Sequence, residues 1–141
     1  KPDVRTKLLE GVRRTANAAA AMAGAPAPDV TLTEGGAAVI NNADVVARTE
    51  VALKAGLGAA NVVRVPPITA SEDFSDYLNQ GVPGMFFFVG VSDPKVVAAS
   101  MQPGGKPLPF NHSPFFAPVP EPSIKTGAEA MSLAVLTVLG K

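Results

Sequence analysis

Residues 84–91 form a continuous apolar run, GMFFFVGV, and this run restricts the possible folds more than any other segment. It has the length of a strand but lacks the alternation of apolar and polar residues that a half-exposed strand shows. Runs of this kind are typical of strands that are buried on both faces of a sheet. The sequence therefore predicts a sheet with covered faces.

The segments around this run alternate between helical and strand patterns. Apolar periodicity predicts helices, and apolar–polar alternation or short apolar runs predict strands. The predicted helices are 4–23, 43–56, 71–81, a turn at 93–100 and the C-terminal 121–141; the predicted strands are 29–34, 61–67 and 84–91. This order predicts an α/β fold with a parallel or mixed sheet in residues 37–141. Residues 1–36 are expected to be the end of a different unit, with Gly35 and Gly36 as the hinge.

Several residues are expected to mark where the helices begin and end. Asn41 or Asn42 is a predicted N-cap of the second helix, and Gly56 is its predicted end. Ser71 is the predicted N-cap of the third helix. Because the chain opens with Lys1 inside a helical pattern, we expect it to be the C-terminal part of a longer protein.

The composition bounds the possible partners. The chain has 12 basic and 12 acidic residues, one tyrosine and no tryptophan, which argues against a nucleic-acid partner. No apolar run approaches the ~18 residues of a membrane span, so we expect a soluble protein, cytoplasmic or periplasmic. The absence of cysteine excludes thiolate metal sites and disulfides and leaves the compartment unspecified.

The single histidine, His112, is the first candidate for chemistry. Two readings are open: a loop histidine bonded to a backbone carbonyl, or a metal ligand held rigid in its segment PLPFNHSPFF. Pro109 and Pro114 stiffen the segment, Asn111 and Ser113 flank the imidazole, and the phenylalanines are expected to exclude water: Phe110, Phe115 and Phe116. A catalytic zinc needs about three protein ligands, so the other ligands would have to come from outside this chain.

A second candidate is the segment TASEDF, residues 69–74. The simple interpretation is the capped start of a helix. The functional interpretation adds that Glu72 or Asp73 follows a predicted strand, where α/β sheets place their sites. The sequence contains no motif for nucleophilic catalysis, because it has neither G-x-S-x-G nor a cysteine. It also contains no phosphate-binding motif, because no glycine-rich loop has the necessary spacing.

Three motifs in order, TASEDFSDYL, VPGMFFFVGV and NHSPFF, followed by VPEPSIKTGAEAMSLAVL, resemble the C-terminal third of the bacterial and plant amidohydrolases. These include hippurate hydrolases, auxin-conjugate hydrolases and the related zinc aminoacylases and carboxypeptidases. The resemblance covers nearly the whole chain. It implies a zinc-peptidase-like α/β catalytic domain, interrupted by a small α+β lid domain that commonly mediates dimerisation. Residues 1–36 would be the last helix and strand of the lid, and residues 37–141 the C-terminal part of the catalytic domain.

The resemblance also implies an activity. The full-length protein would be a metallopeptidase-type hydrolase that cleaves the amide bond of N-acyl amino acids, hippurate-like conjugates or peptide-like substrates. Two divalent metal ions would activate the water, and zinc is the expected metal. His112 would be a metal ligand. The pocket or the residues supporting it would include Ser71, Glu72, Asp73, Phe74, Asn111 and Ser113. The general base and the other metal ligands would lie upstream of Lys1, so this chain would hold no catalytic residue and would be inactive alone. It would pack on the N-terminal part of the same protein, and the full-length protein would form a homodimer.

The chain departs from the family pattern at two places. It has Asn-Asn-Ala at 41–43 where Asn-Asp-Pro is frequent, and Phe115 where a basic residue often follows His-Ser-Pro. Two alternatives therefore stay open. One is a non-catalytic dimerisation or interaction module with residues 1–36 as the dimer-forming element, and the other is a stand-alone α/β ligand-binding domain.

Overall fold

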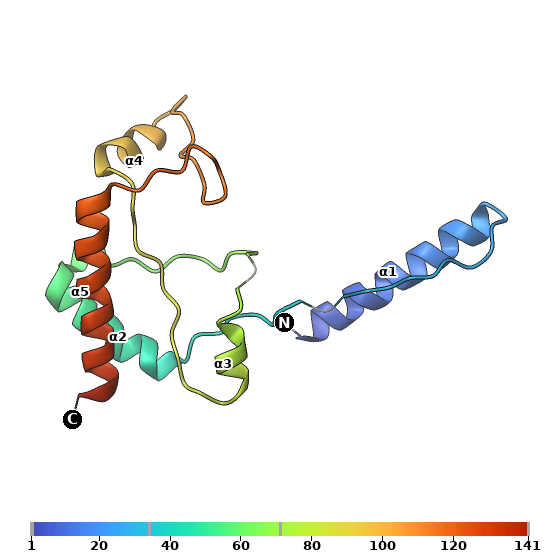
Figure 1. Cartoon of the computed structure of the whole chain (residues 1–141), viewed down its shortest axis with the longest axis horizontal. Coiled ribbons are helices and arrows are strands. Elements are labelled where there is room, and N and C mark those ends of the chain that lie inside the picture. Colours follow the sequence, from blue (N-terminus) through green and yellow to red (C-terminus); the bar gives the residue numbers. More distant parts are fainter. Residues whose placement is uncertain (1, 34, 71, 141) are drawn as a thin grey trace. The chain divides into compact units, whose positions relative to one another are not determined.

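The computed structural model describes residues 2–33, 35–70 and 72–140 of the chain (Figure 1). The described helices, which include one short 3-10 turn (η1), are α1 (Pro2–Met22), α2 (Ala43–Leu57), η1 (Ala59–Asn61), α3 (Ser75–Asn79), α4 (Pro94–Ser100) and α5 (Pro120–Leu139). The chain divides into two compact units. Unit 1 comprises Lys1–Asn41 and Pro66–Gly84, and unit 2 comprises Asn42–Val65 and Met85–Lys141. The predicted domain boundary between residues 36 and 37 stays a prediction.

Unit 1 begins with α1, which confirms the helix predicted over residues 4–23. Its end is fixed by Gly24, whose φ of +65° a residue with a side chain adopts only at a cost. The amide of Ala25 donates to the carbonyl of Ala20 at 2.9 Å, and the amide of Gly24 donates to Ala21 at 3.1 Å. This pair of bonds is the Schellman motif, so the last carbonyls of α1 are satisfied and the chain reverses.

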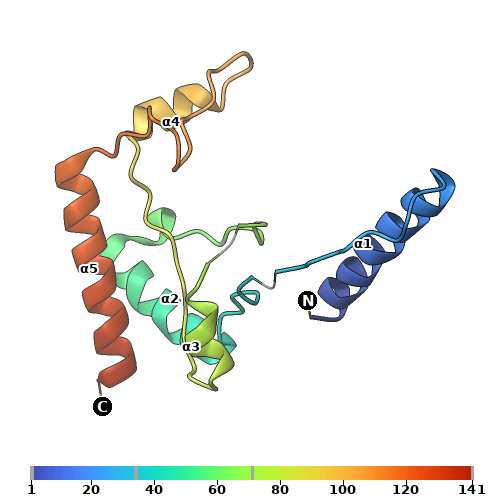
Figure 2. The same ribbon diagram turned by 45° about the vertical axis from the view of Figure 1, so that its right-hand side comes forward.

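After this reversal the chain runs back along α1 (Figures 1 and 2). Side chains of α1 hold the returning segment: Arg13 donates to the carbonyl of Val30 at 3.0 Å, and Arg5 to the carbonyl of Gly35 at 2.9 Å. The strand predicted over residues 29–34 is wrong for residues 29–33, which form no strand; Glu34 lies outside the described residues. The guanidinium groups of Arg13 and Arg5, rather than a neighbouring strand, donate hydrogen bonds to the backbone carbonyls of Val30 and Gly35.

Unit 2 is built on the pair of α2 and α5, which lie side by side. The buried face of α2 is Val45, Thr49 and Leu53, a spacing of four residues that places all three on one side of the helix. The helices approach closely at Gly56, because a Cβ atom built there would lie 2.5 Å from Cδ1 of Leu133 on α5. The small core of unit 2 therefore lies between these two helices.

The ends of α2 agree only partly with the sequence prediction. Asn42 is the N-cap, and its side chain accepts from the amides of Asp44 at 3.1 Å and Val45 at 3.0 Å, as expected. The helix continues past Gly56 and ends before Gly58, which has a φ of +88°. The predicted end at Gly56 was thus wrong by two residues, because the sequence does not show that Gly56 serves helix packing instead.

No sheet is present among the described residues. Helix accounts for 52% of them and strand for none, so the predicted α/β fold class, with an α+β lid before it, is wrong for this structure. The segments predicted as strands, 61–67 and 84–91, are non-helical apart from Asn61 but pair with no other described segment. Their residue types favour an extended backbone, but a strand also requires a ladder of backbone hydrogen bonds with a neighbouring segment, and no such ladder is assigned among the described residues.

The described surface is large and rich in apolar side chains. The accessible area is 11218 Å², whereas two compact proteins of the size of these units would together expose about 8,000 Å². Among the described residues, the buried apolar ones are only Val45, Leu53 and Ala130. None of the described helices combines the length and the hydropathy needed to cross a bilayer. Much apolar surface is therefore left without a partner inside the described part of the chain.

Candidate metal-binding turn

His112 lies in unit 2, in the loop between α4 and α5. The amide of Ser113 donates to the carbonyl of Phe110 at 3.0 Å, and the amide of Phe116 donates to the carbonyl of Ser113 at 3.0 Å. Two successive β-turns therefore share Ser113. The hydroxyl of Ser113 also accepts from the amide of Phe115 at 3.2 Å. These three bonds restrain the backbone on both sides of His112.

The backbone of His112 is left-handed, with a φ of +74°, the one such value among the described non-glycine residues. His112 is the third residue of the first turn, the position at which a type II turn requires a positive φ and favours glycine or asparagine. An L-residue with a Cβ pays about 1–2 kcal/mol for this conformation. The turn therefore keeps a histidine at a position where glycine would be more stable.

The His112 side chain is exposed, and the structure records no hydrogen bond or ion pair between it and any described residue. The interpretation of His112 as a loop histidine bonded to a backbone carbonyl therefore finds no support in the described residues. The predicted apolar wall does not exclude water in this chain, because Phe110 and Phe115 are 80% and 79% exposed. Asn111 is exposed and Ser113 is half-buried.

The loop that carries this turn is anchored at both ends. Gly105 lies against the last carbonyls of α4, so that a Cβ there would meet Ala99, Ser100 and Gln102. At the other end, the amide of Val119 donates to the carbonyl of Val91 at 2.8 Å, and the hydroxyl of Ser123 on α5 reaches the same carbonyl at 3.4 Å. Figure 2 shows the loop folding back beside α4 before it enters α5.

The second group of predicted site residues lies in unit 1. Ser71 is outside the described residues. The carboxylate of Glu72 is half-buried and accepts from the amide of Phe74 at 3.2 Å, while the hydroxyl of Ser75 donates to the carbonyl of Glu72 at 3.3 Å. Asp73 is exposed, and the Phe74 ring lies 5.8 Å from that of Tyr77, measured between centroids. The helix predicted over 71–81 is real but short, because this turn delays its start to Ser75.

A shallow depression of about 380 Å³ lies beside this turn, lined by Gly36, Glu72, Asp73 and Asp76. Its three carboxylates make it acidic, but the described residues contain no group of three or more histidine, aspartate or glutamate side chains arranged to hold a metal ion. The structure thus brings together Asn111, His112 and Ser113 in one turn, and Glu72, Asp73 and Phe74 in another. The two turns belong to different units.

One charged cluster was missed by the sequence analysis. Glu50 on α2 accepts from Arg64 at 2.6 Å and from Lys54 at 2.7 Å. These hydrogen bonds, first that of Arg64 and then that of Lys54, lower the pKa of Glu50 to about 2. The spacing of four residues between Glu50 and Lys54 could have indicated the helical pair, but nothing local indicates Arg64. These ion pairs hold the Arg64 side chain against α2. We therefore interpret the cluster as structural rather than as a binding site.

Comparison with known proteins returned no match: no family model fits the chain, and neither a curated protein nor a solved structure is significantly similar to it.

Proposed function

We propose that this chain is the C-terminal part of a metal-dependent amidohydrolase that cleaves the amide bond of N-acyl amino acids or related hippurate-like conjugates. The sequence motifs around Glu72 and His112 support the proposal through their resemblance to this class of hydrolase. The exposed, unpartnered imidazole in a restrained turn supports it independently. On this proposal His112 binds a divalent metal, with zinc the expected ion.

The observation that carries the proposal is the left-handed backbone of His112. A strained backbone at a residue with useful chemistry favours a functional reason for keeping that residue. Glycine or asparagine would occupy the position at lower cost, but neither offers an imidazole. The turn fits a metal ligand because its backbone is fixed by hydrogen bonds while its ring is free to bind.

The chain supplies one imidazole to such a site, and the other ligands and the general base belong, on this proposal, to the N-terminal part of the same protein. A bound metal would polarise the scissile carbonyl and lower the pKa of water. The exposed apolar area supports a chain that packs against further protein. We therefore expect the isolated chain to be inactive.

The test is to replace His112 by glycine and by asparagine in the full-length protein. Both residues tolerate a positive φ, so the turn should persist and the protein should be as stable as the wild type or more so. We expect the zinc content per chain, measured by atomic emission, to fall and the hydrolysis of hippurate to be lost. Unchanged zinc content in a folded His112→Gly protein would contradict the proposal.

A second candidate function is a non-catalytic dimerisation or interaction module, and α1 gives it a specific observation. An apolar stripe of α1 is exposed at Val4, Leu8, Val12 and Met22, by 48%, 65%, 49% and 85%. Apolar stripes of this kind often contact another chain. The same zinc measurement separates the two functions, because an interaction module does not need His112 to retain metal.

A further inference from the structure

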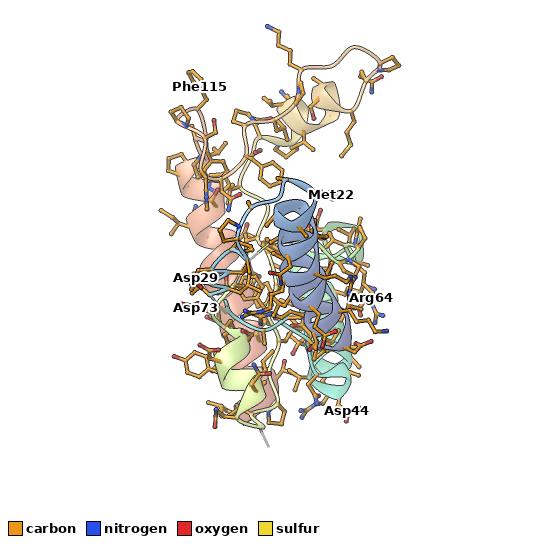
Figure 3. The ribbon with its side chains drawn as sticks, turned by 90° about the vertical axis from the view of Figure 1, so that its right-hand side faces the viewer. Met22, Asp29, Asp44, Arg64, Asp73 and Phe115 are labelled. Carbon is orange, nitrogen blue, oxygen red and sulfur yellow. The ribbon has the colours of Figure 1, made fainter. Side chains whose placement is uncertain are left out.

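The turn that holds His112 also presents three phenylalanine side chains to solvent. Phe110, Phe115 and Phe116 are 80%, 79% and 38% exposed. Single exposed apolar residues are ordinary on a protein surface, but three aromatic rings between positions 110 and 116 form a patch. Figure 3 shows Phe115 projecting at the outer edge of unit 2, beyond the start of α5.

The patch carries no charge. Apart from His112, residues 107–119 contain no acidic or basic side chain, and the flanking charges are Lys106 and Glu121. Glu121 is paired with Lys125 at 2.7 Å. A substrate carboxylate beside these rings would find no opposite charge on a side chain of this segment. The patch therefore suits an apolar, uncharged group.

The rings are tied to His112 through the backbone. Phe110 and Phe115 are two and three residues from His112, so their Cα atoms lie within about 11 Å of its Cα. The bonds of the Ser113 amide to Phe110 and of the Phe115 amide to the Ser113 hydroxyl fix both attachment points. A molecule that is bound at the imidazole and extends along the turn would thus be within reach of these side chains.

From this placement we infer that Phe110 and Phe115 determine specificity, by favouring amides whose substituent beside His112 is apolar and uncharged. The inference rests on the proposed function and adds the substrate class. Because residues 107–119 contain no lysine or arginine, recognition of a substrate carboxylate by such a side chain falls to other parts of the protein. The competing explanation is that protein from the N-terminal part covers the rings, in which case they contribute to stability alone.

The experiment measures kcat/KM of the full-length protein on two substrate pairs. One pair varies the acyl group, N-benzoylglycine against N-succinylglycine, and the other varies the amino acid, N-acetylphenylalanine against N-acetylaspartate. The variants are Phe115→Ala, Phe115→Arg and Phe110→Ala. Met101→Ala is the matched control, since Met101 is apolar, 77% exposed and distant in sequence from His112.

We expect the preference for the apolar member of one pair to fall about tenfold in Phe115→Ala and Phe110→Ala, and further in Phe115→Arg, with no change in Met101→Ala. Zinc content and the circular dichroism spectrum identify variants that are merely unfolded. If the wild type hydrolyses these amides and the folded Phe115→Arg protein keeps both preferences, the inference is overturned while the proposed function stands. If the wild type hydrolyses none of them, the proposed function itself fails.

Discussion

Replacing Thr49 by valine should stabilise the protein. Thr49 lies in the middle of the buried face of α2 with 1% of its surface exposed, and its hydroxyl oxygen has no hydrogen-bond partner among the described residues. A buried hydroxyl left unpaired costs about 1–3 kcal/mol. Valine has nearly the same shape and replaces the hydroxyl by a methyl group, so it removes this cost without opening a cavity.

We take the lower end of that range, because small shifts or a trapped water lessen the penalty. The free energy of unfolding should then rise by about 1 kcal/mol, which moves the urea midpoint by roughly 0.3–1 M for an m-value of about 1–3 kcal/mol/M. The chain contains no tryptophan, so unfolding is best followed by circular dichroism at 222 nm. Most of the helix in unit 2 belongs to α2 and α5, so loss of their packing lowers the signal, to which α1 of unit 1 also contributes.

The matched control is Thr137→Val. The Thr137 hydroxyl on α5 donates to the carbonyl of Leu133 at 2.7 Å, so this substitution removes a hydrogen bond rather than an unpaired group and should not stabilise the protein. A hydrogen bond ordinarily contributes ~1 kcal/mol to stability. If Thr49→Val instead lowers the free energy of unfolding by about 0.5 kcal/mol or more, the Thr49 hydroxyl has a partner and the reasoning is refuted.

Two further predictions concern unit 2. Because the pKa of Glu50 is lowered to about 2 from 4.5, its bonds to Arg64 and Lys54 should stabilise the fold fully above pH 4.5 and be lost as pH falls towards 2. Thermal unfolding from pH 6 to 2 should show a decline that Glu50→Gln reduces, and an identical decline in both proteins would contradict this. Gly58→Ala should destabilise the protein by about 1 kcal/mol, because the φ of Gly58 is +88°. Gly127→Ala, inside α5 with no atom within 4 Å of the added Cβ, should stabilise it by about 0.5–1 kcal/mol in the same denaturation assay, and equal effects would refute the distinction.

The helices could be predicted from the sequence because their signals are local. Asn42 caps α2 with its own side chain, and Gly24 ends α1 through bonds to carbonyls within five residues. The absence of strands could not be predicted, because a ladder depends on a second segment that local patterns do not specify. The apolar run 84–91 has the composition of a buried strand, but no described segment pairs with it.

The candidate site shows the same division. Pro109 and Pro114 indicated a stiff segment around His112, and hydrogen bonds of two successive turns restrain that segment. The positive φ of His112 was not predictable, because such values are uncommon for any residue with a side chain and the turn type is set by the bonds around it. The exposure of the Phe115 side chain was not predictable either, because phenylalanine is usually buried.

The junction at Val91 has a consequence for how this region can vary. Its carbonyl accepts from the amide of Val119 and from the hydroxyl of Ser123, so residues 92–118 depart from and return to one point beside the start of α5. The entropy of closing such an excursion grows slowly, by about 0.6 kcal/mol for each doubling of its length. Insertions or deletions within residues 92–118 should therefore leave the packing of α2 on α5 intact. The segment that carries the His112 imidazole can be lengthened, shortened or replaced without changing the helix pair.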